Sequence, residues 1–182
     1  MADITSETTL EELAAIISQG LESQGILATL SGGAAVSIYT NNRYQSFDLD
    51  FVSSAGSEQL EKAVSALGFV RTDAQRLFSH PQSPWLLEFP AGPLGFGQKV
   101  VDAADLEAIN TPYGPLRVIT PTLCVMDRLA AYLHWQDRQC YDQAIWVCQN
   151  HSIHWEDLKS WAFVEGMDEE LWQIFYDKAS DR

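Results

Sequence analysis

The sequence contains few basic residues. Lys and Arg together number 11, against 25 Asp and Glu, so the formal net charge of the 182 residues is −14 and the pI is about 4.4. Proteins that capture nucleic acid neutralise its phosphates with a basic surface, so this composition argues against a long nucleic acid as a partner. The acidic excess is concentrated at the ends: residues 1–25 and 151–182 each carry −5, whereas residues 26–150 carry −4. We expect an anionic ligand to bind in the middle of the chain.

Cysteines are also few, and long apolar runs are missing. The three cysteines, Cys124, Cys140 and Cys148, are an odd number without a close pair, which argues against a disulfide framework and favours reduced thiols. No apolar run approaches the roughly 18 residues of a membrane-spanning helix, and the first residues lack the pattern of a secretion signal. We therefore expect a cytoplasmic protein without a membrane partner. Neither a Walker phosphate loop nor a Gly-x-Ser-x-Gly motif is present.

The apolar content is high enough to build a core, since 46% of the residues are hydrophobic and 11% are aromatic. Apolar residues recur at helical spacing in residues 9–22 and 57–67. Short strands are predicted at residues 26–30, 47–53, 69–71, 76–79 and 85–89. The predicted class is α/β, of the α+β type, with a sheet core in residues 1–120 and a helical part in residues 121–182.

Two acidic residues share one face of the strand predicted at 47–53. Asp48 and Asp50 alternate with Leu49 and Phe51, so both carboxylates point the same way, with Cβ atoms roughly 6–7 Å apart. Like charges at that distance repel each other unless a cation lies between them, and carboxylate oxygens are ligands that suit Mg²⁺. The pattern predicts a magnesium site at Asp48 and Asp50. The alternative is an acidic strand face exposed to solvent.

A glycine pair lies between the strand predicted at 26–30 and a short helix predicted to begin at Ala34. Gly32 and Gly33 have no side chain that would block the close approach of a ligand. Their amides, together with the positive end of that helix, form a site for phosphate oxygens. With the two aspartates nearby, this arrangement predicts a nucleoside triphosphate that is bound through its phosphates and a bridging Mg²⁺.

The stretches Leu30-Ser31-Gly32-Gly33-Ala34-Ala35 and Ser46-Phe47-Asp48-Leu49-Asp50-Phe51 together resemble the signature of the DNA polymerase beta-like nucleotidyltransferase superfamily. They are most similar to the small Gly-Gly, Asp-x-Asp branch that includes abortive-infection and toxin-antitoxin nucleotidyltransferases. The resemblance implies a mixed β-sheet nucleotidyltransferase core with flanking helices. It also implies transfer of a nucleoside monophosphate from a triphosphate such as ATP to a hydroxyl acceptor at a two-metal Mg²⁺ site, with release of pyrophosphate.

The resemblance further implies a third carboxylate that binds metal and can assist deprotonation of the acceptor. Glu88, in an otherwise apolar strand, is the matching residue, and a strand-end glutamate that reaches solvent is the alternative. Ser31, Gly32 and Gly33 would hold the phosphates of the nucleotide. Given the acidic composition, we favour a protein or small-molecule acceptor over a long nucleic acid.

Later helices in such proteins supply a basic residue to the nucleotide. Arg128 occupies that place in this sequence. A guanidinium on a helix is as readily used in an ion pair, and Asp127, Asp137 and Asp142 are the possible partners. Both roles stay open for Arg128 on the sequence alone.

The C-terminal part is rich in tryptophan. Five of the six tryptophans follow residue 134: Trp135, Trp146, Trp155, Trp161 and Trp172. We expect them to pack the short helices onto the sheet core, and a docking face for a protein partner is the alternative. A protein that keeps the nucleotidyltransferase fold but only binds or regulates, for example in a toxin-antitoxin pair, is the alternative function.

Overall fold

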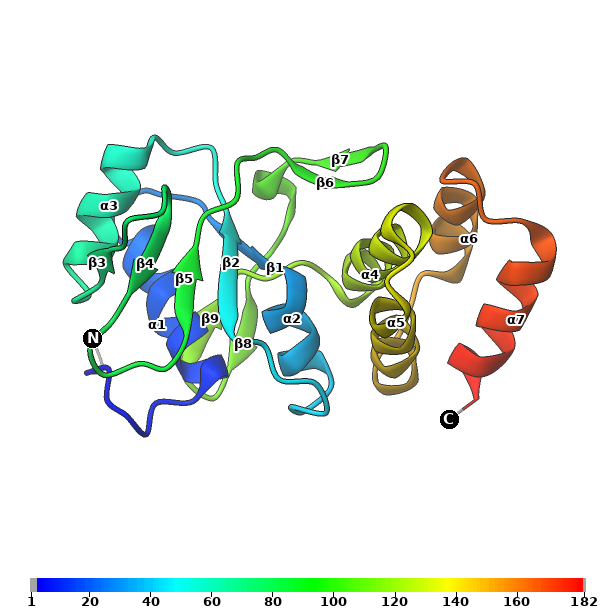
Figure 1. Cartoon of the computed structure of the whole chain (residues 1–182), viewed down its shortest axis with the longest axis horizontal. Helices are drawn as coiled ribbons and strands as arrows, with labels where there is room; N and C mark the ends of the chain where they lie inside the picture. The colour runs from blue at the N-terminus through cyan, green and yellow to red at the C-terminus, as the bar shows by residue number, and fades with distance from the viewer. Residues whose placement is uncertain (1–2, 182) are drawn as a thin grey trace.

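The computed structural model describes residues 3–181, and its elements fall into two groups along the chain (Figure 1). Strands and the helices between them precede Pro121, and the described residues from Pro121 onward form helices and short connections. The first group comprises α1 (Leu10–Glu22), β1 (Thr29–Ser31), α2 (Gly32–Tyr39), β2 (Asp48–Val52), α3 (Ser57–Ser65), β3 (Val70–Arg71), β4 (Leu77–Ser79), β5 (Leu86–Glu88), β6 (Leu94–Phe96), β7 (Lys99–Val101), the 3-10 helix η1 (Ala103–Asp105), β8 (Ile109–Thr111) and β9 (Gly114–Leu116). The second group comprises α4 (Pro121–Trp135), α5 (Arg138–Asn150), α6 (Trp155–Val164) and α7 (Glu169–Ser180).

The strands β1 to β5 form one mixed sheet in the order β1-β2-β5-β4-β3. β2 and β5 run parallel to each other, and the other neighbours are antiparallel. The pairs β6–β7 and β8–β9 are separate two-stranded hairpins. The predicted α/β class with a mixed sheet is confirmed.

The alternation of residues along β2 decides which face of the sheet is buried. Leu49 and Phe51 are fully buried in the core, which also contains residues of α1 and α3. Asp48 and Asp50 alternate with them and lie on the opposite face, where both are half-buried. One face of the strand therefore holds the fold together, and the other is available for chemistry.

Capping residues explain where two of the helices begin. Thr9 Oγ1 accepts the amide of Glu12 at 3.3 Å and starts α1, as the Thr-x-x-Glu pattern indicates. Thr120 Oγ1 accepts the amide of Leu123 at 3.3 Å and starts α4, where Pro121 is the first helical residue.

Two boundaries differ from the predictions. The helix after the glycine pair begins at Gly32 rather than at Ala34, so both glycines belong to the first turn of α2. The strand predicted at residues 26–30 instead spans Thr29–Ser31, because only these residues pair with β2, and Leu27 is 41% exposed.

Two of the C-terminal tryptophans pack the helices against the sheet part, as predicted. Trp161 of α6 is buried and donates its Nε1–H to the Phe96 carbonyl of β6 at 2.9 Å. The Arg43 guanidinium, in the loop after α2, lies 4.4 Å from the ring centroid of Trp146 in α5. The two parts are therefore joined both at the β6–β7 hairpin and at the end of α2.

The other tryptophans of this part differ in exposure. Trp172 is buried, and the Trp155 ring packs edge to face against it at 6.4 Å between centroids. Trp135, at the end of α4, is 82% exposed, so the prediction of packing is wrong for this residue. Within residues 3–181, no helix combines the length and the apolar character that crossing a bilayer requires. The three cysteines are free and buried.

Candidate active site

Three carboxylates meet on the half-buried face of the sheet. Asp48 and Asp50 come from β2 and Glu88 from the parallel strand β5, where Glu88 lies opposite Asp50. One ligand oxygen from each carboxylate lies within 4.8 Å of the other two. Among the residues that the structure describes, no other three His, Cys, Asp or Glu side chains are gathered in this way. The structure thus brings together the three carboxylates that were considered as metal ligands.

Ser31 and Gly32 lie directly beside Asp50. Ser31 is paired with Asp50 in the β1–β2 register, and its Oγ donates to the Asp50 carbonyl at 3.4 Å. Gly32 has a left-handed backbone with φ +64°. An added Cβ there would lie 2.5 Å from Asp50 Oδ2. Glycine is therefore required at position 32 both by its backbone conformation and by the carboxylate packed against it.

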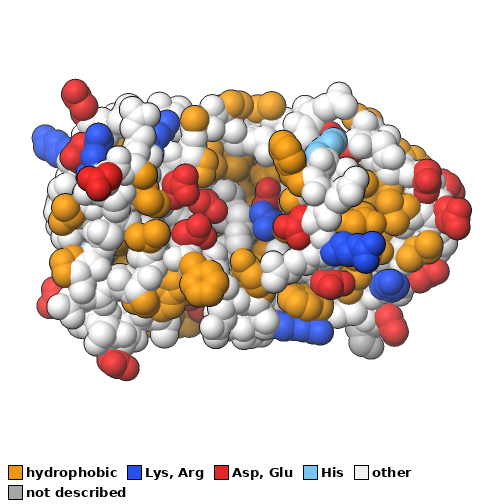
Figure 2. Space-filling model, viewed as in Figure 1, with side chains coloured by type: hydrophobic (Ala, Val, Ile, Leu, Met, Phe, Trp, Pro, Cys, Tyr) orange, Lys and Arg blue, Asp and Glu red, His pale blue; other side chains and the backbone are white. Residues whose placement is uncertain are grey.

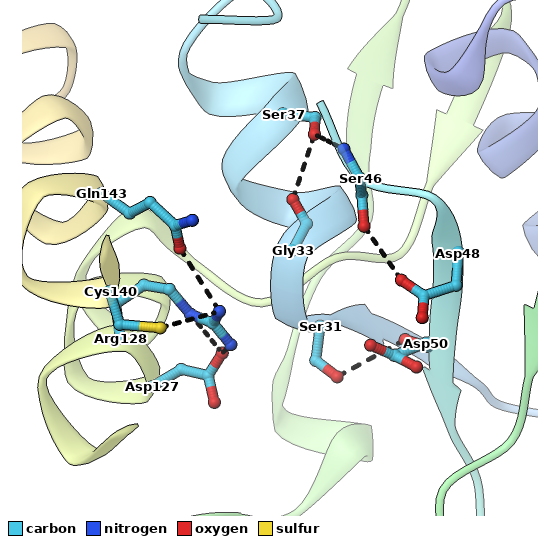
Figure 3. A network of polar contacts seen from close by, with 10 residues as sticks. All are labelled: Ser31, Gly33, Ser37, Ser46, Asp48, Asp50, Asp127, Arg128, Cys140 and Gln143. Atoms are coloured by element: carbon cyan, nitrogen blue, oxygen red, sulfur yellow. Dashed lines mark hydrogen bonds and ion pairs between the residues drawn. The ribbon is translucent and has the colours of Figure 1, made fainter. Parts of the chain in front are cut away.

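The start of α2 lies beside the acids (Figure 3). Ser31 precedes the helix but forms no side-chain cap with its first amides. An added Cβ on Gly33 would lie 2.8 Å from Ser46 Oγ, so this glycine also admits a close neighbour. The first amides of a helix lack intrahelical partners and carry partial positive charge. They suit an anionic oxygen next to Asp50.

Ser46 holds Asp48 in place, and sequence analysis did not single it out. Ser46 Oγ donates to Asp48 Oδ1 at 2.9 Å, and the Ser46 amide donates to Ser37 Oγ at 3.0 Å (Figure 3). Trp85 Nε1 donates to the Ser46 carbonyl at 3.1 Å. The period of two that places both aspartates on one face extends back to Ser46. This spacing in the sequence therefore indicates that Ser46 lies on the same face as Asp48 and Asp50.

Arg128 lies on the helical side of the site, bound to its neighbour Asp127. Its Nε and Nη2 donate to Asp127 Oδ2 at 3.1 and 2.6 Å, and its Nη1 donates to Gln143 Oε1 at 3.4 Å and to Cys140 Sγ at 3.5 Å. The ion pair considered for this residue is therefore present, with the adjacent aspartate as partner. Burial alone would lower the pKa of Arg128, but Asp127, together with Cys140 and Cys124, raises that pKa, so the guanidinium stays charged.

Negative charge accumulates at Asp50. Burial raises the pKa of Asp50 to about 7, with further contributions from the carboxylates of Asp48, Glu88 and Asp127, whereas the charge of Arg128 acts in the opposite direction. Figure 2 shows acidic side chains on both sides of a hollow in the middle of one face, with a basic side chain inside it. A divalent cation would relieve this repulsion, and three carboxylates provide the all-oxygen ligand set that Mg²⁺ prefers.

The sequence matches no family model and no curated protein. The fold, however, is similar to solved structures. An antigenic nucleotidyltransferase-like protein from Paracoccidioides brasiliensis aligns with a TM-score of 0.62 and 15% identity over 96% of this chain and 94% of that one. The crystal structure of ANT(2'')-Ia in complex with adenylyl-2''-tobramycin aligns with a TM-score of 0.53 and 14% identity, over 86% of this chain and 95% of that one.

The solution structure of the same antibiotic-resistance factor, ANT(2'')-Ia, aligns with a TM-score of 0.51 and 14% identity, over 85% of this chain and 89% of that one. The structural alignments establish the fold of the chain. At identities this low they do not indicate its substrate. The alignments span most of both chains, so the similarity includes the helical part as well as the sheet. The chain has the fold of the nucleotidyltransferase-like proteins.

Proposed function

We propose that this protein is a Mg²⁺-dependent nucleotidyltransferase, which moves a nucleoside monophosphate from a nucleoside triphosphate to a hydroxyl acceptor and releases pyrophosphate. The observation that carries the proposal is the cluster of Asp48, Asp50 and Glu88, whose oxygens approach within 4.8 Å beside the start of α2, which has no side-chain cap. The fold of the nucleotidyltransferase-like proteins supports the same class of reaction.

In this proposal the acids hold the metal and handle the proton. Asp48, Asp50 and Glu88 are the metal ligands, and Ser46 keeps the Asp48 carboxylate oriented. Bound Mg²⁺, at two sites, would stabilise the charge on the attacking and leaving oxygens. Glu88 is also the candidate base that accepts the proton of the acceptor hydroxyl.

The phosphates of the nucleotide are bound by backbone and by charge. Ser31, Gly32 and Gly33 lie at the start of α2, which has no side-chain cap, so the first helix amides would donate hydrogen bonds to phosphate oxygens. Arg128 contributes positive charge beside the nucleotide. Because Asp127 already binds Nε and Nη2 of its guanidinium, we expect Arg128 to act through its electric field more than through direct phosphate contact.

We propose a small molecule or a protein as the acceptor, and a cytoplasmic location. A surface with a net charge of −14 repels a long nucleic acid, whereas a single triphosphate is compensated locally by metal and backbone dipoles. The ANT(2'')-Ia complex contains an adenylylated small molecule, which gives a precedent for such an acceptor in this fold. Membership of the abortive-infection or toxin-antitoxin branch is part of the same proposal.

The decisive experiment follows the label of each α-³²P nucleoside triphosphate, with Mg²⁺ and a cell extract, into RNA, protein and small-molecule fractions. We expect transfer by the wild type and none by Asp48→Asn or Asp50→Asn. Asp73→Asn is the matched control, because Asp73 is an exposed aspartate between β3 and β4. Full transfer by both active-site variants, with their fold verified by circular dichroism, would exclude the proposed site.

Calorimetry, combined with the transfer assay, separates the enzyme from the alternative of a binding or regulatory module. An enzyme must bind the Mg²⁺–nucleotide complex, and binding to the folded state raises the melting temperature. Transfer with any extract establishes turnover. Binding and thermal stabilisation without transfer to any fraction would favour a regulatory nucleotide-binding protein, and the exposed Trp135 would then be the first residue to test as a partner contact.

A further inference from the structure

A cavity separate from the three acids lies at the carboxyl ends of the parallel strands β2 and β5. Its volume is about 700 Å³, and it is lined by these strand ends, the β6–β7 hairpin and η1. Val52, Leu94 and Val100 are among the apolar side chains that line it. Within the described part of the chain, none of the carboxylates of the candidate active site lines this cavity. Its size and apolar walls are those of a small-molecule site.

One basic side chain lines the cavity, and it lacks a partner. Arg76 Nε is buried and has no hydrogen-bond acceptor among the described residues. None of the ion pairs in residues 3–181 includes Arg76, although the chain has 25 acidic residues. The carboxylate that lines the same cavity, Asp102, accepts the amide of Ala104 at 2.9 Å and begins η1. No ion pair among the described residues therefore neutralises the charge of Arg76 beside this cavity.

The backbone of Arg76 is strained as well. Its φ is +62°, in the left-handed region that long side chains seldom adopt. The Arg76 carbonyl accepts the Phe89 amide at 3.0 Å, which holds this residue where β4 begins and β5 ends. An unsatisfied buried donor and a left-handed backbone both cost free energy, and such features occur together where a residue is positioned for binding.

We propose that the cavity binds an apolar carboxylate, whose carboxyl group contacts Arg76 and whose hydrocarbon part lies against the apolar wall of the β6–β7 hairpin. The guanidinium presents its N–H groups as a planar fork that matches a carboxylate. Burial of the hydrocarbon part against the apolar wall adds to the binding affinity, because it removes apolar surface from water. A carboxylate without a hydrocarbon part should therefore bind weakly. None of the residues proposed to bind nucleotide or metal lines this cavity.

Three probes separate the two contributions: octanoate, 1-octanol, which lacks the charge, and acetate, which lacks the chain. We expect octanoate to bind the wild type at least about tenfold more tightly than either of the others, since a charged hydrogen bond contributes roughly one decade or more of affinity. Titration calorimetry in EDTA without nucleotide measures this. Equal affinities for octanoate and octanol, or no saturable binding of octanoate, would overturn the proposal.

Substitution of Arg76 tests the charged contact. Arg76→Asn removes the cation with a residue that tolerates the left-handed backbone, and we expect its affinity for octanoate to fall to that for octanol. Arg76→Lys keeps the charge without the fork and should be intermediate. Retention of wild-type affinity by Arg76→Asn would contradict the assignment. The binding measurement uses neither Mg²⁺ nor nucleotide, so failure of the proposed transferase activity would leave this test unaffected.

A second pair of variants tests the same site without altering Arg76. Val100 is 63% exposed at the rim of the cavity, so either charge is tolerated there by the fold. Val100→Asp should weaken octanoate binding by a factor of about 3–10, because it places a like charge near the carboxylate. Val100→Lys loses the same apolar contact and should bind octanoate more tightly than Val100→Asp does. Identical affinities for these two variants would show that no anion binds beside Val100.

Discussion

Asp50 is expected to lower the stability of the metal-free protein. Burial, with the repulsion from Asp48, Glu88 and Asp127, raises the pKa of Asp50 to about 7, whereas an unfolded aspartate ionises near pH 4. The folded state therefore binds the proton more tightly than the unfolded state does. The free energy of unfolding falls as the pH rises from about 4 to about 7, and it levels off above that range.

Asp50→Asn removes this charge and should make the protein more stable at pH 8 in EDTA. The difference between a pKa of about 4 and one of about 7 sets an upper limit of about 4 kcal/mol. Because Asp50 is only half-buried and water screens the repulsion, we expect about 1–2 kcal/mol. For a chain of this length, that corresponds to a rise in melting temperature of roughly 2–8 °C.

Thermal unfolding of wild type and variant from pH 5 to pH 8 measures the effect. The stability gap should widen with pH up to about 7, and saturating Mg²⁺ should reverse it, because metal stabilises the wild type more than the variant. Asp73→Asn, an exposed control, should show no gap that depends on pH. A variant that is less stable than the wild type at pH 8 in EDTA, or a gap that does not grow with pH, would refute the reasoning.

Three further predictions concern other parts of the site and its support. Gly32→Ala and Gly25→Ala both place alanine at a positive φ, and each should lower the free energy of unfolding by about 1–2 kcal/mol. Nucleotide transfer should be lost only in Gly32→Ala, because its Cβ meets Asp50. Loss of transfer in both variants would assign the effect to instability. Ser46→Ala should lower the transfer rate about 10–100-fold with little change in melting temperature, and Ser46→Thr should restore it; an unaffected rate in Ser46→Ala would remove Ser46 from the site. Glu165→Gln should lower the free energy of unfolding by about 1–3 kcal/mol in urea titrations, since this buried carboxylate accepts the Gln98 amide at 2.6 Å and lies 2.8 Å from His134 Nε2. The substitution Glu169→Gln, at an exposed residue, is the control, and an equal loss of stability in the two variants would contradict the argument.

The parts of the site that could be predicted from the sequence are those set by local pattern. The period of two along β2 places Asp48 and Asp50 on one face and Leu49 and Phe51 in the core, and the structure has this arrangement. The glycines before a short helix are likewise a local feature. The placement of Glu88 opposite Asp50 depends on the parallel pairing of β2 with β5, which no local pattern specifies; family resemblance indicated it instead.

Interactions between distant segments explain what was not predicted. Whether Arg128 faces a nucleotide or an acid depends on its environment, and α5 provides Gln143 and Cys140 around the guanidinium. Arg76 carries no motif, and its missing partner becomes visible only when the ends of β2 and β5 meet the β6–β7 hairpin. In the same way, the helical patterns of α4 and α6 do not indicate that Trp135 of α4 is exposed and Trp161 of α6 is buried.

The helical part contributes to the electrostatics of the site as well as to packing. Asp127 and Arg128 act on the ionisation of Asp50 with opposite signs, although they belong to α4 and Asp50 to the sheet. The position of the helices relative to the sheet depends on contacts on both sides of the site, such as Trp161 with Phe96 at the hairpin and Arg43 with Trp146 beyond α2. A change in either contact would alter the distance between α4 and β2, and with it the charge felt at Asp50. The ionisation of Asp50, and with it the affinity of the three carboxylates for a cation, therefore depends on α4 as well as on the sheet.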